Sequence, residues 1–171
     1  MRQLAIKENN VRHGTSRSAA LLLLLAAACS ARAADFDLLG GASATAGLRW
    51  TPVLFADVAG SPVDDGHAHW APVASVGGID SRNTVHEDLD HTVFLAAGGA
   101  RYGGVDGLFF SEQIAATSTR TDALSSRFEF MTSLGWQHGR FIGLVRHISN
   151  AHLLGGGRNL GETMALAGIR I

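Results

Sequence analysis

Most of the chain consists of segments of about ten residues in which apolar residues alternate or mix with polar ones, separated by clusters of Gly, Asp, Asn and Ser. Segments of this length and pattern are typical of β-strands. After residue 33, no apolar run approaches the ~18 residues of a membrane-spanning helix. We therefore expect an all-β fold with a weak strand at 35–41 and seven further strands at 44–53, 69–78, 91–102, 107–117, 126–137, 140–149 and 162–171.

The first 33 residues have a different character. The apolar run "AALLLLLAAAC" is followed by "ARA" at 31–33 and is preceded by four basic residues, Arg2, Lys7, Arg12 and Arg17. This is the order of parts in a secretory signal peptide. The apolar run is about half of the ~20 residues that a transmembrane helix needs. We expect residues 1–33 to be a signal peptide and residues 34–171 to be one β-barrel domain.

The composition of residues 34–171 excludes several classes of protein. Removing the first 33 residues takes away five of the 14 Lys and Arg residues and one of the 15 acidic residues, which leaves nine basic and 14 acidic residues. Neither lysine nor cysteine remains. A nucleic-acid partner is therefore not expected, because there is no basic stripe. Disulfides and a cysteine nucleophile are also excluded.

The expected fold is an eight-stranded antiparallel transmembrane β-barrel. The export signal, the absence of cysteine and strands near the ~9–11 residues that cross a bilayer favour it. A closed barrel also satisfies every backbone group without leaving an edge strand. Alternation is clearest at 126–137, where Phe128 and Phe130 alternate with Arg127 and Glu129. Because a soluble periplasmic β-domain can show the same alternation, it remains the alternative.

The strand at 140–149 carries a possible base and nucleophile. His147 and Ser149 are two residues apart and so share one face of the strand. A serine hydroxyl attacks an ester when a neighbouring base takes its proton, and that base needs a third group to orient it. Glu162 begins the next strand and is the candidate third group, while the Asn150 amide is the candidate oxyanion donor. A chance pairing of polar residues at a strand end is the competing interpretation.

The face of this strand can be predicted from its arginines. Arg140 and Arg146 share a parity, and an arginine facing lipid near the midplane costs about 2–4 kcal/mol. Even positions are therefore expected to face the lumen, and odd positions such as His147 and Ser149 to face lipid. If the first strand leaves the periplasm, both residues lie at the extracellular end of the barrel.

The last strand raises a conflict with this arrangement. Strict alternation back from Ile171 puts Glu162 on the opposite face from Ile169 and Ile171. If the isoleucines face lipid, a bulge or the end of the loop must redirect Glu162 toward the histidine.

The segment "RHISNAHL", followed by a glutamate about a dozen residues later, resembles the PagL-type lipid A 3-O-deacylases, outer-membrane enzymes of Gram-negative bacteria. The similarity continues more loosely back through "SSRFEFMTSLGWQ" and "GLFFSEQIAATSTR". The resemblance implies an eight-stranded barrel in the cell outer membrane that removes the ester-linked 3-hydroxyacyl chain at the 3-position of lipid A. It implies catalytic roles for His147, Ser149 and Glu162, with Asn150 as oxyanion donor. Lipopolysaccharide is then the substrate, outer-membrane lipid the surroundings, and neither a metal nor an organic cofactor is required.

Other interpretations stay open. The alternative function is a non-enzymatic small outer-membrane barrel, structural or adhesin-like. The oligomeric state is open between a monomer and a homodimer. The two histidines of "HEDLDH" at 86–91 are five residues apart rather than four, so a solvated loop is expected there rather than a metal site. Arg158 is a candidate contact for a lipid A phosphate.

Overall fold

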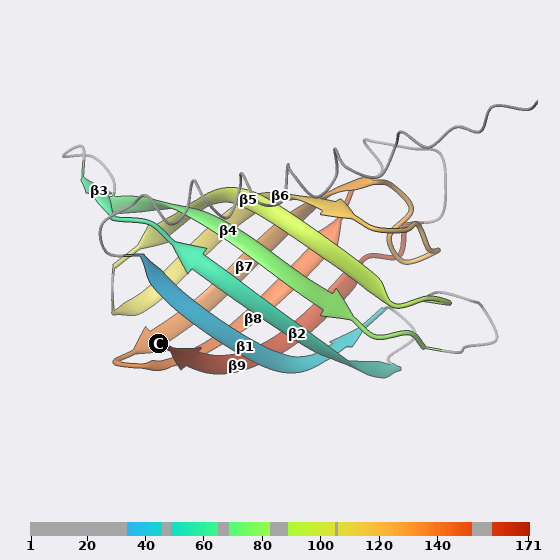
Figure 1. Ribbon diagram of the computed structural model, residues 1–171, viewed down its shortest axis with the longest axis horizontal. Helices are drawn as coiled ribbons and strands as arrows, with labels where there is room; N and C mark the ends of the chain where they lie inside the picture. Colours follow the sequence, from blue (N-terminus) through green and yellow to red (C-terminus); the bar gives the residue numbers. More distant parts are fainter. Residues whose placement is uncertain (1–33, 46–48, 65–68, 83–88, 105, 152–158) are drawn as a thin grey trace, which may run out of the picture.

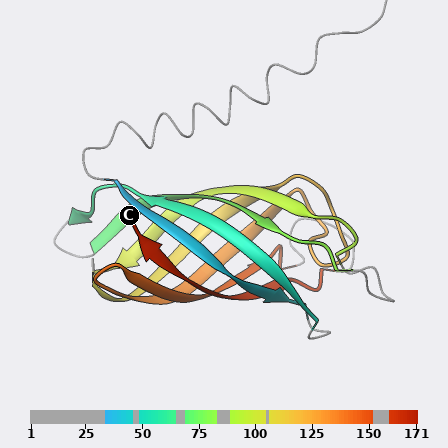
Figure 2. The same ribbon diagram turned by 60° about the horizontal axis from the view of Figure 1, so that its bottom comes forward.

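In the computed structural model, the described residues are 34–171 apart from 46–48, 65–68, 83–88, 105 and 152–158. The predicted signal peptide, the histidine at 86 and Arg158 lie outside the described residues. The described part is a closed barrel of eight long antiparallel strands with one two-residue strand added, and it contains no helix that could cross a membrane (Figure 1, Figure 2). The predicted all-β, eight-stranded barrel is confirmed.

Each long strand pairs with the next long strand in the sequence, so β2 pairs with β4. The barrel closes where the first strand, β1, pairs with the last, β9. The short β3 pairs only with the start of β4. The strands are β1 Asp35–Ala44, β2 Trp50–Ala59, β3 Val63–Asp64, β4 His69–Ile79, β5 Val93–Gly103, β6 Gly107–Thr117, β7 Phe128–His138, β8 Phe141–Ser149 and β9 Glu162–Arg170.

The first two strands differ from the prediction. The weak strand at 35–41 is a full strand of ten residues that ends at Ala44. The predicted strand at 44–53 is wrong, because β2 begins only at Trp50 and continues to Ala59. Apolar residues lie on both faces of β2, since Phe55 points into the barrel and Leu54 points outward. This hides the alternation that marks the other strands.

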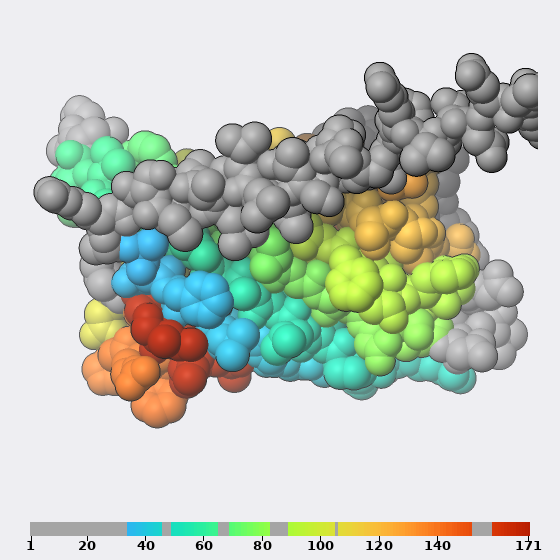
Figure 3. Space-filling model, viewed as in Figure 1, coloured from blue at the N-terminus to red at the C-terminus, as the bar shows by residue number. Residues whose placement is uncertain are grey.

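The barrel interior combines a buried apolar cluster with buried charged and polar groups, and the exterior is apolar. Inside it, Arg146 binds Asp57 at 2.5 Å between Nη2 and Oδ2, and Arg101 binds Asp37 at 3.3 Å. Buried charges of this kind are tolerated as pairs. The outer surface carries exposed bulky side chains, among them Leu54, Phe94, Leu108, Ile114, Leu134, Trp136 and Phe141. The side chains of β1, β2, β4 and β5 lie side by side across one face (Figure 3).

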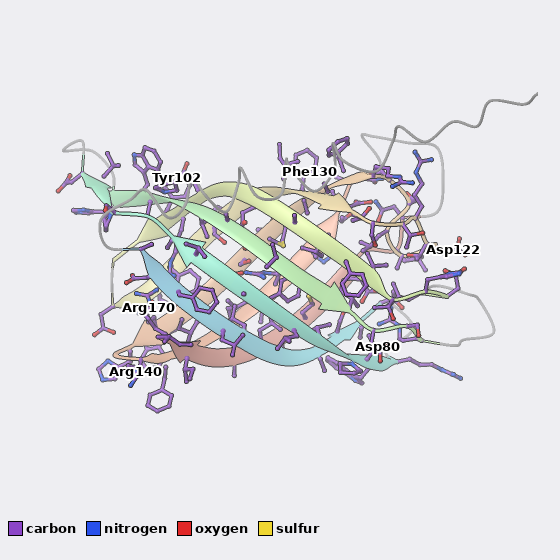
Figure 4. All side chains as sticks on the ribbon, in the orientation of Figure 1. Asp80, Tyr102, Asp122, Phe130, Arg140 and Arg170 are labelled. Carbon is purple, nitrogen blue, oxygen red and sulfur yellow. The ribbon has the colours of Figure 1, made fainter. Side chains whose placement is uncertain are left out.

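The two ends of the barrel differ. The start of β1, the end of β9 and the two-residue connection Gly139–Arg140 lie at one end, where Tyr102, Arg140 and Arg170 are labelled (Figure 4). Gly139 has a φ of 56°, which suits glycine in a tight turn. The ends of β4, β6 and β8 and the starts of β5, β7 and β9 lie at the opposite end, together with the described connection 118–127, whereas the connection from β2 to β4, which contains β3, lies at the first end. We call the first end the turn end and the opposite end the loop end.

Candidate functional site

His147 and Ser149 lie near the loop end of β8 on the outer face of the barrel. The predicted parity is confirmed, because Arg146 is buried inside while His147 is exposed outside. The guanidinium of Arg146 is held in the lumen by Asp57 and by Ser133 Oγ at 3.0 Å from Nε. The cross-strand neighbour of Ser149 is Phe130, which also lies on the outer face (Figure 4).

The imidazole of His147 is held by two residues at the start of β9. Its Nδ1 lies 2.9 Å from Oγ1 of Thr163, its partner on that strand. Its Cε1 and Nε2 atoms lie against Gly161, where an added Cβ would be 2.8 Å from Cε1. Gly161 has a φ of 66°, a conformation that favours glycine. The ring therefore has a defined position at the start of β9.

Ser149 is half-buried, and its Oγ accepts a hydrogen bond of 3.1 Å from the backbone N–H of Ala151. Ala151 has a φ of 51°, so the chain turns sharply directly after the serine. Within the described part of the chain, the side chains of His147 and Ser149 are not hydrogen-bonded to each other. Such contacts are often loose before substrate binds, and these two residues share a face about 7 Å apart at Cα.

The structure does not bring Glu162 together with His147. β8 and β9 pair antiparallel without a bulge, from the Phe141–Ile169 pair to the Ile148–Glu162 pair. Glu162 therefore keeps its inward parity. Its carboxylate is fully buried and accepts hydrogen bonds from Arg82 Nη1 at 3.1 Å, from Arg82 Nη2 and from Ser43 Oγ. The barrel wall separates this carboxylate from the histidine, and the predicted role of Glu162 in orienting His147 is not formed here.

The Asn150 side chain also lies away from the outer face. It is fully buried, and its Nδ2 donates to Ser125 Oγ at 3.2 Å. The amide nitrogen therefore contacts the connection 118–127. Its predicted role as oxyanion donor stays a prediction.

The connection 118–127 fixes the chain that leads into β9. Gly161 donates its backbone N–H to Ala123 O at 2.9 Å, and Asn159 Nδ2 donates to Glu129 Oε2 at 3.3 Å. The other oxygen of Glu129 accepts from the N–H and the hydroxyl of Ser126, both at 2.9 Å. Glu129, which the alternation of β7 turns inward, thus ties this connection to the segment that supports His147.

Two threonines and a glutamate near the histidine were not predicted from the sequence. Strand pairing places Glu112, Thr132, His147 and Thr163 in one row across β6, β7, β8 and β9. The hydroxyl of Thr132 donates to Glu112 Oε2 at 2.7 Å. Parity in β9 was the signal that could have found Thr163, because a residue next to an inward Glu162 must point outward.

An open groove lies on the outer face beside Thr163. Its volume is about 480 Å³, and its lining includes Ala44, Trp50, Val145, Leu160, Thr163 and Ala165. Apart from threonine side chains the lining is apolar, so the groove suits a hydrocarbon chain better than a polar ligand.

Comparison with protein-family models, with curated proteins and with solved structures found no match for this chain. Its function is therefore inferred from the geometry of the barrel and from the His-x-Ser-Asn motif.

Proposed function

We propose that this protein is an outer-membrane lipid A 3-O-deacylase, with Ser149 as nucleophile and His147 as general base. The observation that carries the proposal is the position of these two residues on the outer face of a closed barrel, near its loop end. A nucleophile there meets lipid rather than periplasmic solutes if the barrel spans a membrane. The resemblance of "RHISNAHL" to the PagL-type deacylases supports the same reaction.

An outer-membrane location is supported by the distribution of side chains and connections. Strands of nine to 11 residues with an apolar outer face are typical of outer-membrane barrels, and buried ion pairs lie in the lumen here. Such barrels also have short periplasmic turns and longer extracellular loops. In this orientation the loop end, with Ser149, faces the outer leaflet, where lipid A carries the ester-linked acyl chains.

The proposed chemistry is acyl-ester hydrolysis in two steps. His147 takes the proton of Ser149 as Oγ bonds the ester carbonyl carbon and the carbonyl electron pair moves to oxygen. When the carbonyl re-forms, the bond to the sugar 3-oxygen breaks, and His147 returns the proton to that oxygen. A water activated by His147 then attacks the acyl-enzyme, which releases the 3-hydroxy fatty acid and restores Ser149.

The groove beside Thr163 is proposed to hold part of the acyl chain. Its volume of about 480 Å³ lies within the range of roughly 300–1,000 Å³ that is common for small-molecule sites. Apart from its threonines the lining is apolar and carries no charged group, so the groove suits the hydrocarbon part of the substrate better than the phosphates.

The test is mass spectrometry of lipid A from cells that express the wild-type chain or Ser149→Ala. Loss of one 3-hydroxyacyl group with the wild type alone is the expected result. Both proteins should show heat-modifiable migration on gels, which confirms that the variant folds. A second assay incubates purified protein with lipopolysaccharide in detergent, and it detects an enzyme that is inactive in an intact membrane. A folded wild-type protein that releases no more fatty acid than Ser149→Ala in either setting overturns the proposal.

A non-enzymatic small barrel is the second candidate, and one observation favours it. Glu162 and Asn150, two of the four side chains expected at the site, are buried and bonded to other groups. Under this alternative the outward His147 and Ser149 have no catalytic role. The lipid A assay separates the two functions.

A further inference from the structure

We propose that Thr163, rather than Glu162, is the positioning residue that orients His147. This inference rests on the proposed hydrolase function. The group that orients the general base is then a neutral hydroxyl on the outer face of β9 rather than a carboxylate.

The contact between the two residues has the geometry that the role requires. Thr163 Oγ1 lies 2.9 Å from His147 Nδ1, and strand pairing holds the two residues directly opposite each other. A hydroxyl oxygen that accepts the Nδ1 proton keeps the imidazole in the tautomer whose Nε2 has a free lone pair. That lone pair is what a general base needs to take the serine proton.

Glu162 is committed to the interior of the barrel. Its carboxylate receives two donors from Arg82 and one from Ser43, and it is fully buried. To reach His147 it would have to cross the barrel wall and leave Arg82 without this carboxylate in a buried site, which is strongly unfavourable. The unbroken pairing of β8 and β9 provides no bulge that could redirect it.

Gly161 restricts the ring further. Because an added Cβ at Gly161 would lie 2.8 Å from Cε1 and 3.2 Å from Nε2, only a glycine leaves room for the ring in this position. The N–H of Gly161 is itself bonded to Ala123 O. The imidazole is thus held by a hydroxyl at Nδ1 and by an anchored backbone beside its Cε1 and Nε2 atoms.

Thr132 provides a matched control. It is the partner of His147 on β7, just as Thr163 is its partner on β9. The hydroxyl of Thr132 donates to Glu112 rather than contacting the imidazole. Replacing either threonine with valine therefore makes the same chemical change on either side of the same ring.

The first experiment measures hydrolysis of lipopolysaccharide in detergent by purified wild type, Thr163→Val, Thr163→Ser, Thr132→Val and Glu162→Gln. Loss of one neutral hydrogen bond predicts a fall in kcat of roughly five- to tenfold for Thr163→Val, with KM within about twofold. Thr163→Ser should restore most of kcat, and Thr132→Val should stay within about twofold of wild type. Glu162→Gln should lose less kcat than Thr163→Val at a temperature where both proteins are folded. A Thr163→Val enzyme with wild-type kcat, or a larger loss of kcat in Glu162→Gln, overturns the inference.

A second measurement does not depend on activity. The ¹⁵N chemical shifts of His147 in micelles, assigned by the signals missing from His147→Gln, report which ring nitrogen carries the proton. Wild type and Thr163→Ser should show the Nδ1-protonated form, whereas Thr163→Val should show a mixture of tautomers. Equal tautomer populations in wild type and Thr163→Val overturn the inference. A wild type that hydrolyses no more substrate than Ser149→Ala, but shows the expected tautomers, overturns the proposed function and leaves the positioning contact standing.

Discussion

Single residues at the start of β9 determine the shape of the candidate site. Gly161, Glu162 and Thr163 follow one another, yet they serve as ring support, lumen ion-pair partner and imidazole partner respectively. The roles of Glu162 and Thr163 follow from the directions in which their side chains point, and the role of Gly161 follows from its lack of a side chain. Substitutions at these positions should therefore separate catalysis from stability.

Gly161→Ala should impair catalysis more than folding. A Cβ at Gly161 meets the His147 ring at 2.8 Å, and the φ of 66° adds strain of about 1–3 kcal/mol. We expect kcat to fall at least about tenfold, because a misplaced base is costly. The control is Gly143→Ala on the outer face of β8, where an added Cβ meets nothing within 4 Å and kcat should be unchanged. Equal kcat values for the two variants would contradict the assigned position of the ring.

Glu162→Gln should destabilise the barrel. Removing the charge of one partner of a buried ion pair costs on the order of 3 kcal/mol. The unfolding midpoint in urea, measured in detergent micelles, should fall accordingly. Asp106→Asn is the control, because the His138–Asp106 pair is exposed and should contribute less than about 1 kcal/mol. A midpoint for Glu162→Gln equal to that of the control would argue against a stabilising role for the Arg82–Glu162 pair.

At the level of elements, the pairing of β8 with β9 and of β9 with β1 brings the base and the groove together. Val145 and Ala165 are cross-strand partners on the outer face, two residues from His147 and Thr163 respectively. Ala44 on β1 pairs with Thr163 from the other side. The groove is thus built from residues of β1, β2, β8 and β9, with Trp50 of β2 and Leu160 at the loop end.

Ala165→Phe should reduce the preference for long acyl chains. Filling the groove removes contacts with about two methylene groups, each worth ~0.8 kcal/mol, so kcat/KM for a long-chain ester should fall roughly tenfold. Hydrolysis of a short-chain ester should change little. Ala167→Phe, two residues further along the same outer face and outside the groove, is the control. Equal losses for long and short chains would place the acyl chain elsewhere.

For the whole molecule, the exterior differs most from that of a water-soluble protein, because exposed bulky apolar side chains cover it, while the interior holds both a buried apolar cluster and charged pairs. Charged pairs such as Arg146–Asp57 lie inside and join β8 to β2 across the lumen, while large apolar side chains cover the outside. An apolar exterior of this kind is typical of membrane barrels and is uncommon in soluble monomeric β-domains.

Leu134→Arg should test the membrane environment directly. Leu134 is exposed on the outer face near the middle of β7, where arginine costs about 2–4 kcal/mol if the face meets lipid. Phe128→Arg, at the loop-end start of the same strand, should cost less than about 1 kcal/mol. Unfolding in lipid vesicles measures both values. Two near-zero values would contradict a membrane-spanning barrel.

Much of this architecture could be predicted from the sequence. The predicted strand at 107–117 matches β6, and those at 126–137, 140–149 and 162–171 differ from β7, β8 and β9 by at most two residues at an end. These strands alternate clearly, and their parity alone placed Arg146 inside and His147 outside. The boundaries of β2 were missed because its apolar residues occupy both faces.

The sequence by itself determined that the fold is all-β and that His147 points outward, because both follow from patterns within single strands, while the length of the strands and the export signal indicated a barrel. The tertiary structure alone decided which residue stands beside that histidine. Parity within β9 showed that Glu162 and Thr163 point in opposite directions, but the pairing of β9 with β8 set Thr163 opposite His147. The carboxylate remains inside because Arg82, distant in the sequence, is its partner there. Contacts between strands depend on register and on partners far along the chain, and a pattern within one strand contains neither.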